Sequence, residues 1–162
     1  MVDRQSLIDG LGLKSVARTG WLRVGIEDVE SVAAHSWGMA FIASQICPDE
    51  IDRAKVIEMC IVHDLAEVVT GDITPHDGVS TAEKSRLERA AFEQLSLADN
   101  TEQLFDEYEQ QVTLEARFVR FVDRLDMALQ ASVYEAKGAD LSEFKESVKD
   151  LAHDHGFSHL LE

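Results

Sequence analysis

The stretch IDRAKVIEMCIVHDLAEVV, residues 51–69, carries a clear helical pattern. Its apolar side chains recur three or four residues apart, which places them on one stripe of a helix. That stripe comprises Ala54, Ile57, Ile61, Leu65 and Val68. The triplet TGD at 70–72 follows, and its glycine favours a stop. We therefore expect one helix from Ile51 to about Val69.

Similar patterns extend in both directions from this stretch. Val32, Met39 and Ile46 follow helical spacing, and Ser80 with Glu83 has the spacing of an N-terminal capping box. No alternation of period two exceeds four residues, so the sequence predicts an all-α protein. The expected helices cover residues 3–13, 31–46, 80–97, 101–111, 114–136 and 141–153, the fourth and fifth being nearly continuous; the remaining expectations are an irregular ordered segment at 14–28, a loop at 75–79 and a stop at Gly138.

Length and composition predict one soluble domain. The chain has 162 residues, of which 45% are hydrophobic and 28% charged, as in ordinary globular proteins. No apolar run approaches the roughly 20 residues of a membrane span, and the first residues lack the apolar core of a secretory signal. Two cysteines, Cys47 and Cys60, are too few for a disulfide framework, and we expect both to be small core residues. These features favour a cytoplasmic location.

The charge is strongly negative. Asp and Glu number 31 against 15 Lys and Arg, which gives a formal net charge of −16. Such a surface repels nucleic acids and anionic membranes, so neither is an expected partner. The charge is explained by solubility or by adaptation to a salty host, and the composition does not separate the two. An anionic substrate would require local positive charge, which a bound cation and one or two arginines can supply.

Three titratable groups lie close together near the end of the expected helix 51–69. Glu67 follows His63 by four residues and Asp64 by three, so all three would share one edge of the helix. A lone histidine beside an apolar stripe is more often a hydrogen-bonded core residue than a ligand. Packing three polar groups there is costly unless something compensates them, and a divalent cation bound by imidazole and carboxylate would do so.

Two further polar groups lie in apolar surroundings on other helices. His35 has Val32 and Met39 on its face, and Asp123 lies in the pattern ARFVRFVDRLDMAL at 116–129. Taken singly, His35 is explained as a buried imidazole with one hydrogen bond, and Asp123 as a surface carboxylate paired with Arg120 or Arg124. Taken together with residues 63 and 64, they supply two imidazoles and two carboxylates from three helices.

The order His35, His63-Asp64 and Asp123, together with the short motifs around these residues, resembles the HD-domain metal-dependent phosphohydrolases. The motifs are RTGW at 18–21, ESV-x-x-H at 30–35, VHDLAE at 62–67, TGDITP at 70–75, EYE at 107–109, EARFV at 115–119 and LQASVYE at 129–135. They are similar to the HD-domain-containing protein 2 group, relatives of the bacterial 5′-deoxynucleotidases. The similarity runs from about residue 14 to 136. It implies a single HD-domain helical bundle over residues 1–162, with a C-terminal helical extension at 137–162.

The resemblance implies a hydrolase that converts deoxyribonucleoside 5′-monophosphates to deoxynucleoside and phosphate. It implies one divalent metal ion, and the mixed ligand set suits Mn, Co, Fe, Ni or Zn better than Mg or Ca. The implied metal ligands are His35, His63, Asp64 and Asp123. Glu67 matches the residue that orients the attacking water and takes its proton. The implied substrate-binding residues are Arg18, Trp21, His35, Asp64, Asp72, Ile73, Thr74, Pro75 and Asp123.

Within this set, Arg18 matches an arginine that orients the phosphate, which suits its planar fork of donors. Asp72 is expected either to bond the deoxyribose hydroxyl or to protonate the leaving 5′-oxygen. Trp21 is expected to stack on base or ribose, or to belong to the core, because two residues separate it from Arg18 where the bacterial relatives have none. Arg23 is a further candidate for the phosphate.

Two alternatives remain open at this stage. One is an enzyme of the same superfamily that acts on a triphosphate, a cyclic nucleotide or an alarmone. The other is a non-enzymatic module that binds metal or nucleotide. A homodimer is expected from the family.

The remaining histidines and acids receive structural interpretations. His76 is expected to be a loop residue near the pocket, and the run DEYEQQ at 106–111 a solvated helix face. The sequence HDH at 153–155, with His159, is expected to form a frayed polar end. Ala34 replaces an acid that could complete a capping box with Ser31, which costs a little helix stability.

Overall fold

A computed structural model describes residues 2–136, 138 and 140–161 of the chain. Within those ranges the regular structure is helical, and the single pairing of extended segments is an isolated antiparallel bridge between Ala17 and Ser31. The helices are α1 (Arg4–Leu11), η1 (Gly12–Ser15), α2 (Thr19–Arg23), α3 (Val32–Ile46), α4 (Arg53–Val62), α5 (Glu67–Thr70), η2 (Pro75–Asp77), α6 (Thr81–Gln94), α7 (Asp99–Gln110), α8 (Leu114–Glu135), α9 (Ser142–Glu146), α10 (Lys149–Asp154) and η3 (Ser158–Leu161). The all-α prediction is confirmed.

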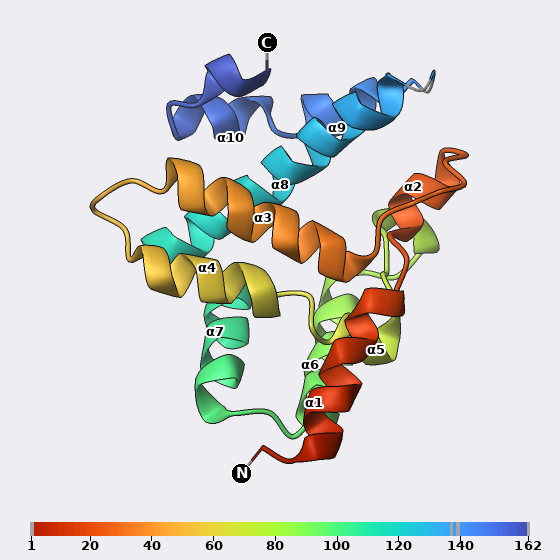
Figure 1. Cartoon of the computed structure of the whole chain (residues 1–162), viewed down its shortest axis with the longest axis vertical. Coiled ribbons are helices and arrows are strands. Elements are labelled where there is room, and N and C mark those ends of the chain that lie inside the picture. The colour runs from red at the N-terminus through yellow and green to blue at the C-terminus, as the bar shows by residue number, and fades with distance from the viewer. Residues whose placement is uncertain (1, 137, 139, 162) are drawn as a thin grey trace.

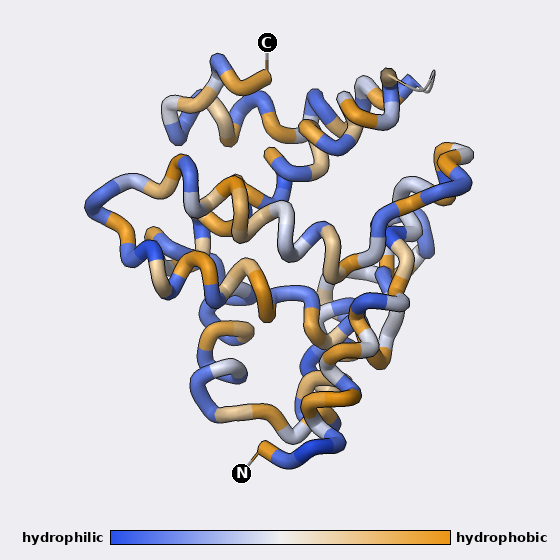
Figure 2. Tube along the Cα trace, in the orientation of Figure 1, coloured by the Kyte–Doolittle hydropathy of each residue, from blue (hydrophilic) through white to orange (hydrophobic). Residues whose placement is uncertain are grey.

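The centre of the molecule is a packed group of three helices, α3, α4 and α8 (Figure 1). Their facing side chains form the main core, where Met39, Met59, Phe118, Val122 and Leu125 are completely buried. Figure 2 shows hydrophobic and hydrophilic segments interleaved along these helices, as expected when each has one buried face. Helix α7 packs against α4 and α8, and α6 packs against α5. In the described residues no helix is both long and apolar enough to cross a bilayer.

Side-chain caps determine where several helices begin. Ser31 accepts a hydrogen bond from the Ala34 N–H, and Thr113 caps α8 in the same way through the Ala116 N–H. Each such cap is worth about 1 kcal/mol. Ser80 caps α6 through the Glu83 N–H as its spacing predicts, but the Glu83 carboxylate binds Arg86. In α3, Ala34 stands where an acid could complete a capping box, so Ser31 is the cap residue at the start of this helix.

The single helix expected over residues 51–69 is wrong. Helix α4 ends at Val62, residues 63–66 form successive turns, and α5 begins at Glu67. In these turns the Leu65 N–H binds the Val62 carbonyl and the Glu67 N–H binds the Asp64 carbonyl, which is three-residue rather than four-residue spacing. His63, Asp64 and Glu67 consequently do not share the edge of one regular helix.

Three other boundaries differ from the sequence expectation. The segment 14–28 contains the short helix α2, and the loop 75–79 begins with the 3-10 turn η2. Helices α7 and α8 are separated at Gln111, whose φ of 54° is left-handed. Gly138 donates its N–H to the Glu135 carbonyl at a φ of 100°, which confirms the stop after α8.

The C-terminal segment packs on the core instead of fraying. The long helix expected at 141–153 is divided into α9 and α10, with Val148 between them completely buried. The His155 ring stacks on Phe121 at a centroid distance of 4.8 Å, and Phe157 stacks on the same ring at 5.6 Å. We call Phe118, Phe121, His155 and Phe157 the C-terminal aromatic cluster.

Candidate active site

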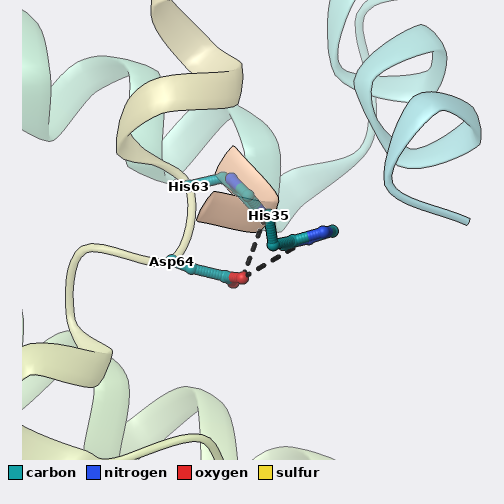
Figure 3. A group of neighbouring side chains, drawn as sticks. All are labelled: His35, His63 and Asp64. Carbon is teal, nitrogen blue, oxygen red and sulfur yellow. Dashed lines mark ion pairs between the residues drawn. The ribbon is translucent and has the colours of Figure 1, made fainter. Parts of the chain in front are cut away.

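Three segments bring the four predicted metal ligands to one place. His35 projects from the middle of α3, His63 and Asp64 come from the turn after α4, and Asp123 comes from α8. Figure 3 shows His35 and His63 both facing the Asp64 carboxylate. The Asp64 Oδ2 atom lies 3.1 Å from His63 Nε2 and 4.0 Å from His35 Nε2. Asp123 Oδ1 lies 3.2 Å from His35 Nε2 on the other side.

The imidazoles present the donor atoms that a metal ion requires. In the described part of the chain, Nε2 of both His35 and His63 is buried and has no hydrogen-bond partner. Each ring is held through its other nitrogen, since His63 Nδ1 lies 3.0 Å from the Cys60 carbonyl and His35 Nδ1 lies 2.7 Å from Asp126. Ligand atoms of His35, His63 and Asp64 lie within 4.8 Å of one another. This arrangement fits a divalent cation, because neutral Nε2 and carboxylate oxygen are common ligands.

The charges around the site are strongly coupled. Burial and the charge of Arg18 lower the pKa of His35, but the carboxylates of Asp123 and Asp126 outweigh both and raise it to about 9. Burial raises the pKa of Asp64, but His63 and Arg18 hold it well below its usual range. Arg18 Nη1 lies 3.7 Å from Asp64 Oδ2. The site therefore already favours a positive charge between its carboxylates.

Glu67 begins α5, three residues after Asp64. Its side chain is 1% exposed, and Oε2 has no hydrogen-bond partner among the described residues. Burial, with the nearby charges of Asp64 and Asp72, raises the pKa of the Glu67 carboxyl far above its ordinary value of 4.5. A carboxyl in this state can hold and exchange a proton.

A cleft of about 700 Å³ opens beside the four predicted ligands. Arg18, Asp64, Glu67 and Asp123 line it, whereas His35 is completely buried and is not part of its lining. Five of the 15 basic residues of the chain border this cleft: Arg18, Arg23, Lys84, Arg120 and Arg124. Seven acidic residues border it as well: Asp64, Glu67, Asp72, Glu88, Glu109, Asp123 and Glu143. Arg23 pairs with Glu143 and Lys84 with Glu88, so binding an anion here would depend on Arg18 together with a bound cation.

The TGDITP segment forms one wall of this cleft. Ile73, Thr74 and Pro75 line it as expected, and Thr74 and Asp77 form a reciprocal capping box that orders the turn η2. Asp72 accepts hydrogen bonds from the Thr19 N–H at 2.7 Å and the Thr19 hydroxyl at 3.1 Å. Asp72 therefore fastens this wall to the segment that carries Arg18.

Comparison with known proteins was made on sequence and on structure. A sequence model described as HD domain matches residues 12–156. The chain belongs to the HD domain family. HD domains are metal-dependent, and two groups in the described residues could hold a metal ion: His35 with His63 and Asp64, and His35 with Glu30 and Asp126. Only the first group borders the cleft, through His63 and Asp64.

The HD-domain relatives are similar over most of this chain. The protein named 5′-deoxynucleotidase hdd1 of Schizosaccharomyces pombe is 41% identical over 155 residues, covering 87% of this chain and 78% of that protein. The human protein named 5′-deoxynucleotidase HDDC2 is 39% identical, covering 76% of this chain; the chain spans 63% of its length. Among solved structures, the PH0347 protein of Pyrococcus horikoshii OT3 superposes with a TM-score of 0.81 at 32% identity, over 96% of this chain and 98% of that one.

The HD domain places Trp21 in the core. The side chain is 2% exposed and packs against Phe144 and Tyr134 at centroid distances of 4.4 and 5.2 Å. Its indole N–H donates to Glu30 at 3.0 Å. Trp21 also borders the cleft, and between the two roles that the sequence left open its burial favours the core. Arg23 borders the cleft and binds Glu143 at 2.6 Å.

Sequence reasoning missed several residues that border or support the site of this HD domain. Asp126 holds His35, and its position three residues after Asp123 on α8 was an available signal. Tyr108 donates to Asp123 at 3.4 Å and packs edge-on against His63, so part of the acidic run 106–111 supports the site. His76 borders the cleft as predicted. Both cysteines are buried, as expected. Candidate metal groups in the described residues do not include the C-terminal histidines.

Proposed function

We propose that this chain is a 5′-deoxynucleotidase that hydrolyses deoxyribonucleoside 5′-monophosphates to deoxynucleoside and phosphate. The observation that carries the proposal is the pair of unpartnered Nε2 atoms of His35 and His63, set against two carboxylates at a cleft that Arg18 borders. The names of the relatives in yeast and human support the substrate class.

One divalent transition metal ion, Mn, Co, Fe, Ni or Zn, is proposed to bind His35, His63, Asp64 and Asp123. The buried, preoriented nitrogens and the charge balance described above support this ligand set. The chemistry that such an ion supplies is Lewis-acid polarisation of the phosphoryl group.

Arg18 and Glu67 have separate proposed roles. Arg18 borders the cleft next to Asp64, where its guanidinium can donate two hydrogen bonds to phosphate oxygens. Glu67 has a buried oxygen with no partner in the described structure, which can orient a water molecule for attack on phosphorus. Its ionised form can receive the proton of that water, and a cation bound at the neighbouring ligands would favour this form. The bond between phosphorus and the 5′-oxygen then breaks, and that oxygen takes a proton from solvent in the open cleft.

Asp72 is proposed to accept the deoxyribose hydroxyl. Both contacts of its carboxylate with Thr19 are made by Oδ2, at 2.7 Å from the N–H and 3.1 Å from the hydroxyl, so the carboxylate is held as an acceptor. Between the two roles that the sequence left open, this favours binding the sugar over protonating the leaving group. Ile73, Thr74 and Pro75 are proposed to line the nucleoside part of the cleft.

The decisive experiment is phosphate release by metal-reconstituted protein on matched deoxyribo- and ribonucleoside 5′-monophosphates, with triphosphates and cyclic nucleotides in the same panel. We expect release from the deoxyribonucleoside monophosphates. Turnover confined to triphosphates or cyclic nucleotides would refute the proposal. Glu67→Gln should keep metal binding and lose at least a hundredfold in kcat.

A homodimer is also proposed, and an exposed aromatic pair supports it. Trp37 and Phe41 on α3 are 70% and 53% exposed and stack in parallel at 5.6 Å. Paired exposed aromatics are typical of protein interfaces. Light scattering should give twice the chain mass, and Trp37→Ser should shift the equilibrium toward monomer. The cytoplasmic location stays a prediction.

A further inference from the structure

We propose that Asp126 is a positioning residue for the metal site: it fixes the His35 ring with Nε2 toward the other ligands, and Gly38 is required because it makes room for Asp126. The inference rests on the metal site of the proposed function. It concerns two residues that contact neither the cleft nor the other ligands of the proposed ion.

The hydrogen bond to His35 defines which ring nitrogen is available. Asp126 Oδ2 lies 2.7 Å from His35 Nδ1, in a pair that is buried on both sides. The Asp126 carboxylate accepts the hydrogen on Nδ1, so Nε2 is the ring nitrogen that faces the site, and a cation bound there would take the place of any hydrogen on it. Carboxylates that hold a metal-ligating histidine in this way orient the ring and raise its basicity.

Helix α8 supplies carboxylates to both sides of the ring. Asp123 lies 3.2 Å from His35 Nε2, and Asp126, three residues later on the same face, lies against Nδ1. His35 is completely buried between them. Any rotation of the ring therefore breaks the contact with Asp126 and moves Nε2 away from the site.

Gly38 makes room for the Asp126 carboxylate that holds His35. A Cβ atom at this position would lie 2.2 Å from Asp126 Oδ1, far inside the distance at which two such atoms can coexist. Glycine is unfavourable in the interior of a helix such as α3, so its presence calls for a local reason. The close approach of Asp126 provides that reason. A methyl group here would push the carboxylate off Nδ1.

The nearby Glu30 provides a matched control. It offers a carboxylate oxygen within 4.8 Å of ligand atoms of His35 and Asp126, and it is partly buried. Its carboxylate accepts the Trp21 indole N–H instead of holding the imidazole. Glu30→Gln therefore removes a charge at similar distance while leaving the His35 contact intact.

The experiment measures metal affinity on the full chain, stripped with chelator and titrated with Co²⁺ against a competing indicator. Parent, Asp126→Asn, Gly38→Ala, the double variant and Glu30→Gln are compared, with the visible Co²⁺ spectrum recorded for each. We expect Asp126→Asn and Gly38→Ala each to weaken Co²⁺ binding by roughly 10- to 100-fold, with a changed spectrum. The double variant should be no weaker than Asp126→Asn, because Gly38 acts through Asp126. Glu30→Gln should bind within about threefold of the parent.

The outcomes separate the two proposals. A parent that binds Co²⁺ while both Asp126→Asn and Gly38→Ala bind within threefold of it overturns the role of Asp126 and leaves the proposed function standing. A parent that binds no Co²⁺ overturns both. Circular dichroism on each metal-free variant identifies a loss of Co²⁺ binding that is caused by unfolding. If Asp126→Asn is unfolded, Gly38→Ala alone tests the proposal. A Gly38→Ala variant whose visible Co²⁺ spectrum matches that of the parent then overturns the role of Asp126.

Discussion

Replacing Glu67 by methionine should stabilise the metal-free protein while abolishing turnover. Glu67 is 1% exposed and leaves Oε2 without a partner within the described residues. An unsatisfied buried polar atom costs about 1–3 kcal/mol. Methionine has similar volume and no such atom, so the packing is largely kept. We expect the free energy of unfolding to rise by about 1–3 kcal/mol near neutral pH.

The stability that Glu67→Met gains over the parent should increase as pH rises. The ordinary pKa of this carboxyl is 4.5, and burial with the charges of Asp64 and Asp72 raises it in the folded protein. Above pH 4.5 the unfolded chain has lost this proton and the folded protein still holds it. The parent therefore loses stability as pH rises, by at most about 1.4 kcal/mol per pH unit from this group. Glu67→Met lacks this loss, so its advantage should widen from pH 5 to pH 8.

Guanidinium chloride unfolding of chelator-treated protein at pH 5 and pH 8 measures both effects. For a chain of this length, each kcal/mol also moves Tm by roughly 2–4 °C. Glu58→Met serves as control, because Glu58 is exposed and its replacement should change stability by less than about 0.5 kcal/mol. A variant that is less stable than the parent, or an advantage that is equal at both pH values, would refute the reasoning.

Three further outcomes are expected. Trp21→Phe should lower the free energy of unfolding by about 1–3 kcal/mol in denaturant titrations, since it leaves Glu30 without its buried donor; unchanged stability would contradict the core assignment. Burial lowers the pKa of His155, so the parent should lose stability as pH falls below about 6.5, and His155→Phe should flatten this acid limb in thermal melts. Thr19→Val should raise KM more than it lowers kcat, since it removes the hydroxyl that binds Asp72; a kcat effect alone would speak against positioning through Asp72.

The helices were predictable where local chemistry and apolar spacing agree. Ser31, Ser80 and Thr113 cap α3, α6 and α8, and each can be recognised in the sequence as a cap residue before an apolar pattern. The break after Val62 could not be seen in this way, because Leu65 and Val68 continue the apolar spacing through the turns. Periodicity reports which side chains face inward, and a chain of turns can satisfy that as well as a helix.

The C-terminal segment shows the opposite failure. Its histidines and acids suggest a polar end, yet Val148 and Ala152 are completely buried and His155 lies on an aromatic ring of α8. Imidazole is flat and amphipathic, so a histidine in a polar stretch of sequence can still pack against an apolar core. The contact joins residues more than thirty positions apart, which composition does not report.

The site itself was predictable as residue types and not as an arrangement. His35, His63, Asp64 and Asp123 could be chosen because each is a polar group in an apolar pattern, a combination that a stable fold tolerates only with compensation. The support of the site breaks no such rule: Asp126 resembles any helix carboxylate until Gly38 is seen to face it. The unfavourable groups therefore indicate that a site exists, whereas the residues that give it geometry satisfy every local rule and become visible only when α3 and α8 are packed together. Residues of the second kind are where a substitution that looks neutral in the sequence should do the most damage to metal binding.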